Sequence, residues 1–113
     1  MANALPWARR GGRKIVGAVA QIAAFLADFD MDLEEAFHQP RIDVSGGVSI
    51  TANAALPPAV LEALLSIATV TPTRPSLLPY PFGCASAVLD DGVRRYGMTE
   101  VLSAWGDAVA EPA

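Results

Sequence analysis

A long and almost uniformly apolar helical pattern constrains this chain more than any other feature of its sequence. Between residues 13 and 29, apolar side chains recur at intervals of three and four, which predicts an α-helix; they are Ile15, Val19, Ile22, Leu26 and Phe29. Val16 and several alanines make the remaining faces small or apolar as well. A helix of this kind is usually buried on nearly every side. We therefore expect a sheet against one face and a further layer, or a second chain, against another.

The composition of the chain supports the expectation of a partner. The chain has 113 residues, of which 52% are hydrophobic and 18% are charged. A chain of this length forms one domain, here residues 1–113, and small domains bury a smaller fraction of their surface than large ones. We therefore expect part of the apolar surface to meet another chain, in a homodimer or a larger assembly. A compact, alanine-rich monomer is the alternative.

Charge and cysteine content exclude several classes of function. The net charge is −4, and the densest basic group, within residues 9–14, is too small and lacks the aromatic residues of a nucleic-acid site. The single cysteine, Cys84, excludes an internal disulfide and a cysteine-based metal site. The apolar run is interrupted by Gln21 and Asp28 and is shorter than the ~20 residues of a membrane span. We expect a soluble protein, cytoplasmic as the sequence stands, with no cofactor.

The first half of the chain predicts a second helix and two short strands. Asp32 followed by Glu35 is a capping-box pattern, which predicts the start of a helix. Pro40 ends that helix, because its ring disfavours a helical backbone at the preceding residue. Polar and apolar residues then alternate over residues 41–44 and 48–52, as in half-buried strands.

The second half predicts further helices and a β-hairpin. The expected elements are a helix from Pro57, a strand over residues 68–71, a proline-rich loop over 72–83, a hairpin of strands 85–89 and 93–98, and a helix from Thr99 to about Ala108. The dipeptide Asp91-Gly92 is the strongest hairpin signal. Residues 1–10 show no regular pattern and are expected to be an irregular N-terminal segment. The predicted fold class is α+β, with helices packed on a mostly antiparallel sheet.

Three positions carry chemistry that a site could use. His38 is the only histidine, and without a clear partner it is better interpreted as a structural or surface side chain than as a general base. Cys84 has no cationic neighbour in sequence and is expected to be a structural thiol. Gly11 and Gly12 precede the long helix, where backbone N–H groups and the helix dipole can bind an anion. A flexible turn is the alternative interpretation of the two glycines.

Several short stretches follow one another in a fixed order: Gly11-Gly12-Arg13-Lys14-Ile15, the apolar helix, residues 30–36 (DMDLEEA), Pro40-Arg41, Leu56-Pro57, residues 83–88 (GCASAV), Asp91-Gly92 and Tyr96-Gly97. Their order and spacing resemble the C-terminal part of the small subunit of the gamma-glutamyltransferases, also called gamma-glutamyltranspeptidases. The resemblance covers residues 11–98 and leaves residues 99–113 as a divergent tail.

The resemblance implies a fold and a chemistry. Members of that family are N-terminal nucleophile hydrolases with an αββα sandwich. A precursor cleaves itself and frees a threonine, which attacks the gamma-glutamyl amide of glutathione and related compounds; the acyl group then passes to water or to an acceptor amine. Gly11 and Gly12 match the glycines whose amides form the oxyanion hole of the family, a device that covalent catalysis requires.

The chain also departs from the family pattern. The threonine nucleophile lies upstream in the family and is not found here. Arg13-Lys14 replaces a small hydroxyl residue followed by arginine, and residues 98–101 replace an Asp-Pro-Arg motif. The resemblance therefore implies a fragment that is inactive alone and pairs with an upstream chain carrying the nucleophile.

Two other interpretations remain. The chain could be a free-standing α+β module that self-associates or binds a partner without catalysis. It could also be a small enzyme that uses His38 with Asp43 or Glu34.

Overall fold

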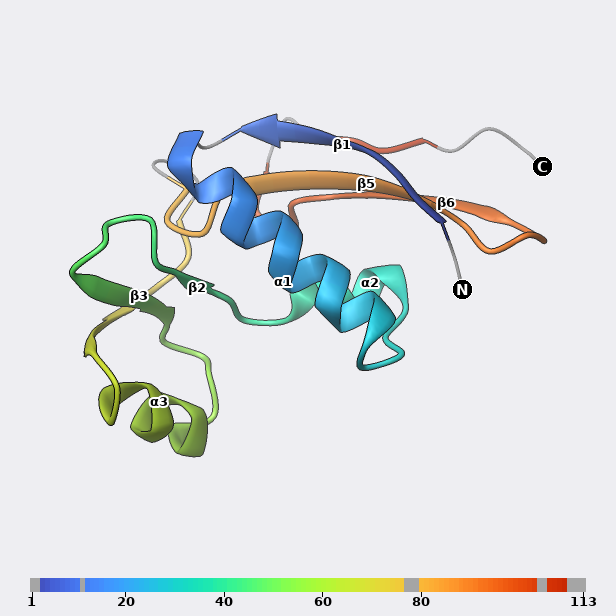
Figure 1. The fold of residues 1–113 in the computed structure, drawn as a ribbon. Coiled ribbons are helices and arrows are strands. Elements are labelled where there is room, and N and C mark those ends of the chain that lie inside the picture. Colours follow the sequence, from blue (N-terminus) through green and yellow to red (C-terminus); the bar gives the residue numbers. More distant parts are fainter. Residues whose placement is uncertain (1–2, 11, 77–79, 104–105, 110–113) are drawn as a thin grey trace.

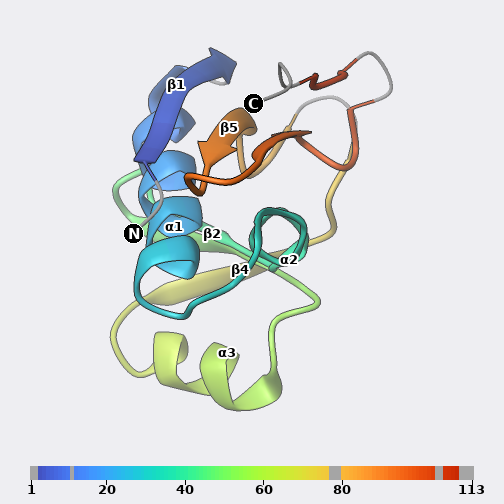
Figure 2. The ribbon, with the colours of Figure 1, turned by 90° about the vertical axis from the view of Figure 1, so that its right-hand side faces the viewer.

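A long helix contacts two small sheets, and a short helix packs beside it on one of them, in the computed structural model of this chain, which describes residues 3–10, 12–76, 80–103 and 106–109 (Figure 1 and Figure 2). The first helix is preceded by a 3₁₀ turn, and these elements are η1 (Gly12–Lys14), α1 (Ile15–Ala27) and α2 (Leu33–His38). Helix α1 contacts β1 and β5 on one side and β2 on another, while α2 packs on β6. The predicted α+β class is confirmed.

The strands form two sheets rather than the single sheet that the sequence predicted. In the first sheet β5 lies between two antiparallel neighbours, and its strands are β1 (Asn3–Arg10), β5 (Cys84–Asp90) and β6 (Arg95–Thr99). The second sheet has an antiparallel pair, β2 (Ile42–Asp43) and β3 (Ser49–Asn53), and adds β4 (Thr69–Thr73) parallel to β3. Helix α3 (Pro58–Leu65) is the crossover that a parallel pair of strands requires.

The core lies between α1, α2 and the first sheet. Ile22 and Phe37 are its largest fully buried side chains, and they belong to one cluster with Ala85 and Ala87 of β5. The side chain of Gln21 attaches α1 to the second sheet: its Nε2 donates to the Ile42 carbonyl at 2.8 Å and its Oε1 accepts from the Ile42 N–H at 2.8 Å. The two sheets are therefore held on opposite sides of the same helix.

Helix α2 begins at the predicted capping box. The Asp32 carboxylate accepts from the Glu35 N–H at 2.8 Å, and the Glu35 carboxylate accepts from the Asp32 N–H at 3.0 Å. Gln39, just before Pro40, has extended dihedral angles and ends the helix. The chain then enters β2, as predicted.

Helix α1 is covered less completely than its apolar pattern predicted. Only Ala18 and Ile22 are buried, and Val16 is 77% exposed. Ala20 and Ala27 are exposed on the same side, since positions four and eleven residues after Val16 lie on one helical face. The face that was expected to meet a further layer or chain is uncovered in the described part of this chain. None of the helices there is long and apolar enough to cross a membrane.

The structure corrects the prediction that residues 1–10 are irregular. Asn3–Arg10 is strand β1, whose backbone pairs with β5 from Asn3↔Asp90 to Arg10↔Cys84. The register shifts between Leu5 and Ala8, so the ladder contains an irregularity around Pro6, which has no N–H to donate. Because proline is uncommon within strands, the local sequence pattern did not predict this one.

The predicted helix from Thr99 to Ala108 is also wrong. Thr99 is the last residue of β6 and pairs with Ser86, and the Glu100 N–H continues the ladder to the Ala85 carbonyl at 2.8 Å. The described residues after it, 101–103 and 106–109, contain turns and irregular backbone. Pairing with β5 holds Thr99 in an extended conformation, so it cannot begin a helix.

Candidate functional site

The glycine turn predicted as an oxyanion site lies between β1 and α1. Gly11 falls outside the described residues, while Gly12 opens η1 with a φ of +57°. Gly12 is exposed, and a Cβ built on it would meet no atom within 4 Å. Among the described side chains none caps α1, so they leave the N–H groups at its start without an acceptor. This arrangement can present backbone donors and the positive end of a helix dipole to an anion.

The loop that precedes β5 supports this turn. Lys14 Nζ donates to the Pro81 carbonyl at 3.1 Å. Gly83, at a φ of +76°, packs so closely that a Cβ there would lie 3.3 Å from Ala18 Cβ and 3.4 Å from the Lys14 carbonyl oxygen. The turn is thus attached to the start of β5 through both its side-chain and its backbone contacts.

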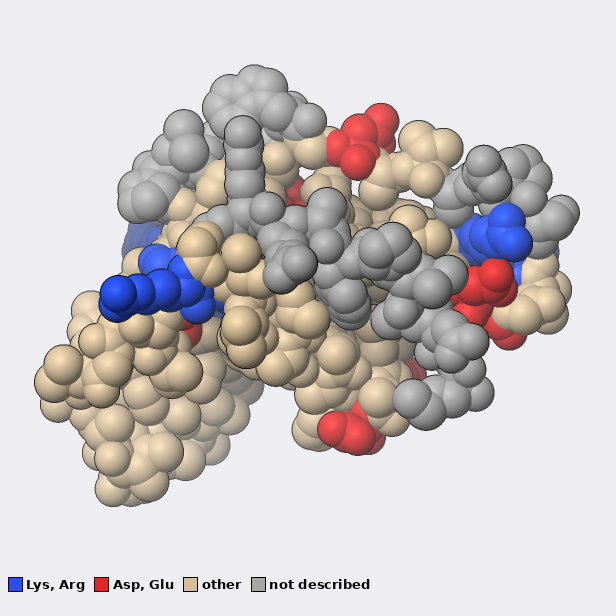
Figure 3. All heavy atoms as spheres, turned by 45° about the horizontal axis from the view of Figure 1, so that its top comes forward, with Lys and Arg blue, Asp and Glu red and all other residues tan. Residues whose placement is uncertain are grey.

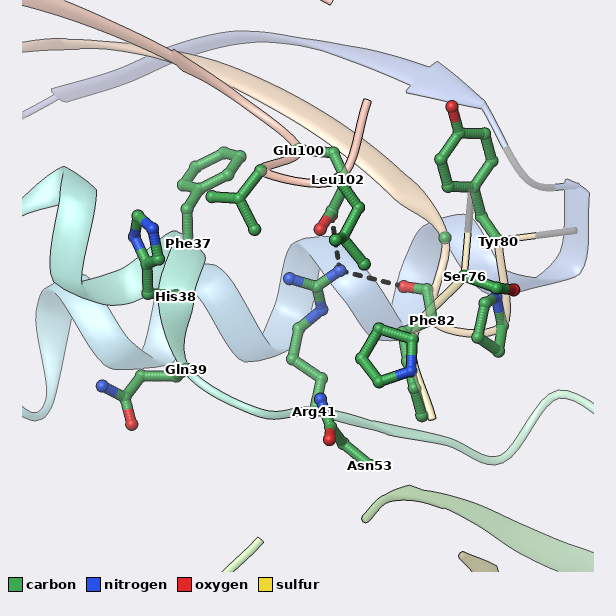
Figure 4. Close-up of a pocket in the computed structure, with 14 residues that line it drawn as sticks. Phe37, His38, Gln39, Arg41, Asn53, Ser76, Tyr80, Phe82, Glu100 and Leu102 are labelled. Atoms are coloured by element: carbon green, nitrogen blue, oxygen red, sulfur yellow. Dashed lines mark hydrogen bonds and ion pairs between the residues drawn. The ribbon is translucent and has the colours of Figure 1, made fainter. Parts of the chain in front are cut away.

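A buried ion pair lies on the other side of the same loop. Arg41 Nη2 donates to Glu100 Oε2 at 2.8 Å and to the Phe82 carbonyl at 3.2 Å, and the two charged side chains are 5% and 8% exposed (Figure 4). Burying one charge alone is strongly unfavourable, so each ion depends on the other. The pair joins the residue before β2 to the residue after β6, and therefore joins the two sheets.

The ion pair forms part of the wall of a cavity of about 170 Å³. The cavity lies between the end of α2, the loop before β5 and the residues after β6 (Figure 4). Its apolar lining residues include Phe37, Tyr80, Phe82 and Leu102. Arg41 Nε is buried without a hydrogen-bond partner among the described residues. This combination of aromatic walls and a few polar groups is typical of small-molecule sites.

The structure does not form the acid–base pair that an independent enzyme would need. His38 is exposed, and its Nδ1 lies 2.8 Å from the Glu34 backbone carbonyl. Asp43 instead accepts from the Ser45 hydroxyl at 2.8 Å. Within the described ranges, no ion pair joins His38 to a carboxylate. Nor do three side chains of His, Cys, Asp and Glu come together there in a way that could hold a metal ion.

Charged side chains are sparse on the face of the molecule drawn in Figure 3. Basic and acidic groups form small separate patches, and most of the described surface in that view is uncharged. The described side chains in this view form no basic stripe of the kind that binds nucleic acid.

The sequence pattern did not indicate that four residues meet around the loop before β5, namely Lys14, Gly83, Arg41 and Glu100. Arg41 and Glu100 are 59 positions apart, and neither residue lies in a charge pattern that would suggest a pair. Gly83 could have been noticed, because a glycine before a strand often marks a close approach of two backbones.

The overall fold is that of part of the gamma-glutamyltranspeptidases. A highly active mutant of gamma-glutamyltranspeptidase from Pseudomonas nitroreducens superposes with a TM-score of 0.70 over 94% of this chain and 55% of its own, at 19% identity. A mutant of the Helicobacter pylori gamma-glutamyltranspeptidase gives a TM-score of 0.69 over 86% and 53%, at 20% identity. The transpeptidase CapD of Bacillus anthracis gives 0.70 over 95% and 69%, at 15% identity.

These similarities confirm the resemblance at the level of the fold. The chain spans about half the length of the first of these structures. No protein-family model matches the chain, and no curated protein matches it.

Proposed function

We propose that this chain is the C-terminal part of a gamma-glutamyltransferase-like enzyme and supplies its oxyanion turn. In the complete enzyme a threonine hydroxyl attacks the gamma-glutamyl amide, the amine leaves, and the acyl group passes to water or to an acceptor amine. The observation that carries the proposal is the position of Gly12, an exposed glycine at a positive φ before an uncapped helix, in a fold shared with gamma-glutamyltranspeptidases.

The oxyanion role rests on the geometry around Gly12. A tetrahedral intermediate places negative charge on the former carbonyl oxygen, and backbone N–H groups fixed in advance stabilise that charge. The space around Gly12 allows a substrate to approach, because, its two chain neighbours apart, no described atom lies within 4 Å of a Cβ built there. Gly11, next to it, is proposed as the second donor.

The nucleophile must come from another segment of polypeptide. The five threonines of this chain, Thr51, Thr69, Thr71, Thr73 and Thr99, all lie within β3, β4 or β6. A threonine nucleophile of this type is activated by its own N-terminal amine, which a residue inside a strand does not have. We therefore expect the chain alone to be inactive and to need an upstream chain or segment.

A pull-down of this chain from its own cells tests the proposal. We expect a larger polypeptide whose new N-terminal residue is threonine, identified by mass and N-terminal sequencing. The purified complex should release p-nitroaniline from gamma-glutamyl-p-nitroanilide, whereas this chain alone should not. A complex without that activity, or activity of the chain alone, would contradict the proposal.

Gly12→Ala tests the oxyanion turn within such a complex, with Gly47→Ala as the matched control. Both glycines have a positive φ, +57° and +81°, and open space around a built Cβ, so local strain should be similar. Gly47 lies in the turn between β2 and β3. Alanine at position 12 keeps the backbone N–H but disfavours a φ of +57°, so the turn should no longer hold its donors in place. We expect the kcat of Gly12→Ala to fall by about tenfold or more, less than the 10²–10³ that full loss of one oxyanion donor costs. Equal effects of the two variants on kcat would show that Gly12 has no specific role in the oxyanion site.

Exposed apolar side chains favour a second candidate function, association without catalysis. Val16 of α1, Leu65 at the end of α3 and Ile67 just beyond it are 77%, 61% and 76% exposed. A second chain could cover these surfaces whether or not it carries a nucleophile. Recovery of only copies of this chain in the pull-down would favour a self-associating module and end the search for an active site here.

A further inference from the structure

We infer that the cavity beside the Arg41–Glu100 ion pair binds a small, uncharged heteroaromatic ring that carries one hydrogen-bond acceptor. This site lies apart from the glycine turn, and the inference does not depend on the proposed enzymatic function. Figure 4 shows the Arg41 guanidinium in the middle of the lining residues, with Phe37 and Tyr80 on opposite sides.

The volume of the cavity selects the size of the ligand. Its volume is about 170 Å³, and an apolar cavity of about 150 Å³ holds a benzene molecule. A single six-membered ring therefore fits within it. The aromatic walls formed by Phe37, Tyr80 and Phe82 favour a planar ring, because aromatic pairs pack edge-to-face or offset.

The charged residues that line the cavity favour an uncharged ligand. The lining contains one cation, Arg41, and one anion, Glu100, and these two groups bind each other at 2.8 Å. Neither charge is left over to attract an ion of opposite sign. A charged ligand would lose its hydration without gaining a counter-charge, which is unfavourable in a largely apolar cavity.

The Nε–H of Arg41 favours a ligand whose ring carries a hydrogen-bond acceptor. Nε is buried, and among the described residues it has no hydrogen-bond partner, although Nη2 of the same guanidinium has two. Its N–H has therefore already lost its hydration, so an incoming acceptor recovers a hydrogen bond to a charged group. Nε has almost no exposed surface, so the acceptor reaches it only after a small movement of the lining. Leu102 is exposed and Tyr80 is only partly buried, which permits such a movement.

Pyridine and benzene are a matched pair of probes, because they have the same shape and only pyridine has an acceptor. At pH 8 pyridine is uncharged. We expect both rings to bind the ¹⁵N-labelled chain in solution with dissociation constants on the order of 1 mM, as expected for ligands of six heavy atoms. Pyridine should move the Arg41 Nε–H resonance to higher ¹H frequency in a saturable way, and benzene should not.

Leu102→Trp tests whether the rings occupy this cavity. The larger side chain should fill the space beside Arg41 and weaken pyridine binding at least tenfold. Leu65→Trp on α3, outside the lining residues, is the matched control and should leave binding unchanged. Both variants keep the buried ion pair intact, so neither should prevent folding.

Three results would overturn the inference. If neither ring binds, the cavity holds only water. If benzene binds while pyridine does not shift the Arg41 Nε–H, the cavity is purely apolar and the donor is not used. If Leu102→Trp binds pyridine as tightly as the parent chain, the ring occupies another place.

Discussion

At the scale of single residues, the buried Arg41–Glu100 pair couples distant parts of the chain. It is buried, it spans 59 positions of sequence, and it joins the two sheets. Removal of one member leaves the other charge buried without a counter-charge. Such losses cost several kcal/mol, whereas replacement of both members by apolar groups is often tolerated.

We predict that Glu100→Ala lowers the free energy of unfolding by about 3 kcal/mol, measured by urea denaturation. The double variant Arg41→Met with Glu100→Leu should recover most of that loss, because no charge then remains buried. Glu62→Ala, at an exposed position on α3, is the control and should change stability by less than about 0.5 kcal/mol. A double variant no more stable than Glu100→Ala would show that the unpaired charge of Arg41 is not the cause of the loss.

The hairpin turn gives a prediction about pH. The Asp91 carboxylate accepts from the Arg94 N–H at 2.6 Å and the Val93 N–H at 2.8 Å, and these backbone bonds lower the pKa of Asp91 below its ordinary 3.8. A carboxyl group whose pKa is depressed by folding stabilises the fold above its unfolded value and loses that contribution as pH falls through the folded value. The turn should therefore loosen only below about pH 3.8.

An NMR titration from pH 6 to pH 2 measures this effect on the amides of Val93 and Arg94. Their signals should move together with the Asp91 side-chain carboxyl carbon, with a midpoint below 3.8. Asp91→Asn should abolish that shared transition. A midpoint at or above 3.8 would mean that the two bonds do not form in solution.

At the scale of elements, the attachment of η1 and α1 to the loop before β5 depends on Gly83. We predict that Gly83→Ala destabilises the chain by about 2–3 kcal/mol, from backbone strain at a φ of +76° and from overlap with Ala18. Gly92→Ala has the same kind of strain, at a φ of +89°, with nothing within 4 Å of the new Cβ. It should cost only about 1 kcal/mol. Thermal unfolding of the two variants compares them, and equal costs would rule out the contact with Ala18.

Elements that depend on short sequence intervals were predictable. Helix α2 followed from Asp32 and Glu35, three positions apart, and from Pro40, because capping and proline chemistry act within one turn. Helix α3 followed in the same way from the prolines at its start. Both elements would form from the same local signals in many different folds.

Elements that depend on a distant partner were not predictable. Strand β1 contains Pro6 and exists because β5, some 80 positions away, pairs with it. Thr99 was expected to begin a helix, but its pairing with Ser86 keeps it in a strand. The same distinction holds for the candidate site. The position of Gly12 before a helix followed from local pattern. The Arg41–Glu100 pair and its cavity form only when both sheets meet.

At the scale of the whole molecule, the uncovered face of α1 is where we expect a second chain. Val16, Ala20 and Ala27 lie on that face. We predict that Val16→Glu weakens association with the copurified partner, or with a second copy, by at least tenfold in sedimentation velocity experiments. Val93→Glu, 75% exposed on the hairpin, is the matched control and should have no effect. Association of Val16→Glu as tight as that of the parent would place the interface elsewhere.

The pairing of β1 with β5 also has a consequence for the order of folding. The second sheet and α3 are built from one continuous stretch, residues 42–73, whose contacts close short loops. The first sheet must close a loop of most of the chain before β1 can dock, and such closures are slow and entropically costly. Strand β1 should therefore be the last element to dock and the first to detach. The turn at Gly12 acquires its shape only at that final step, so the rate at which β1 docks sets the rate at which the candidate site forms.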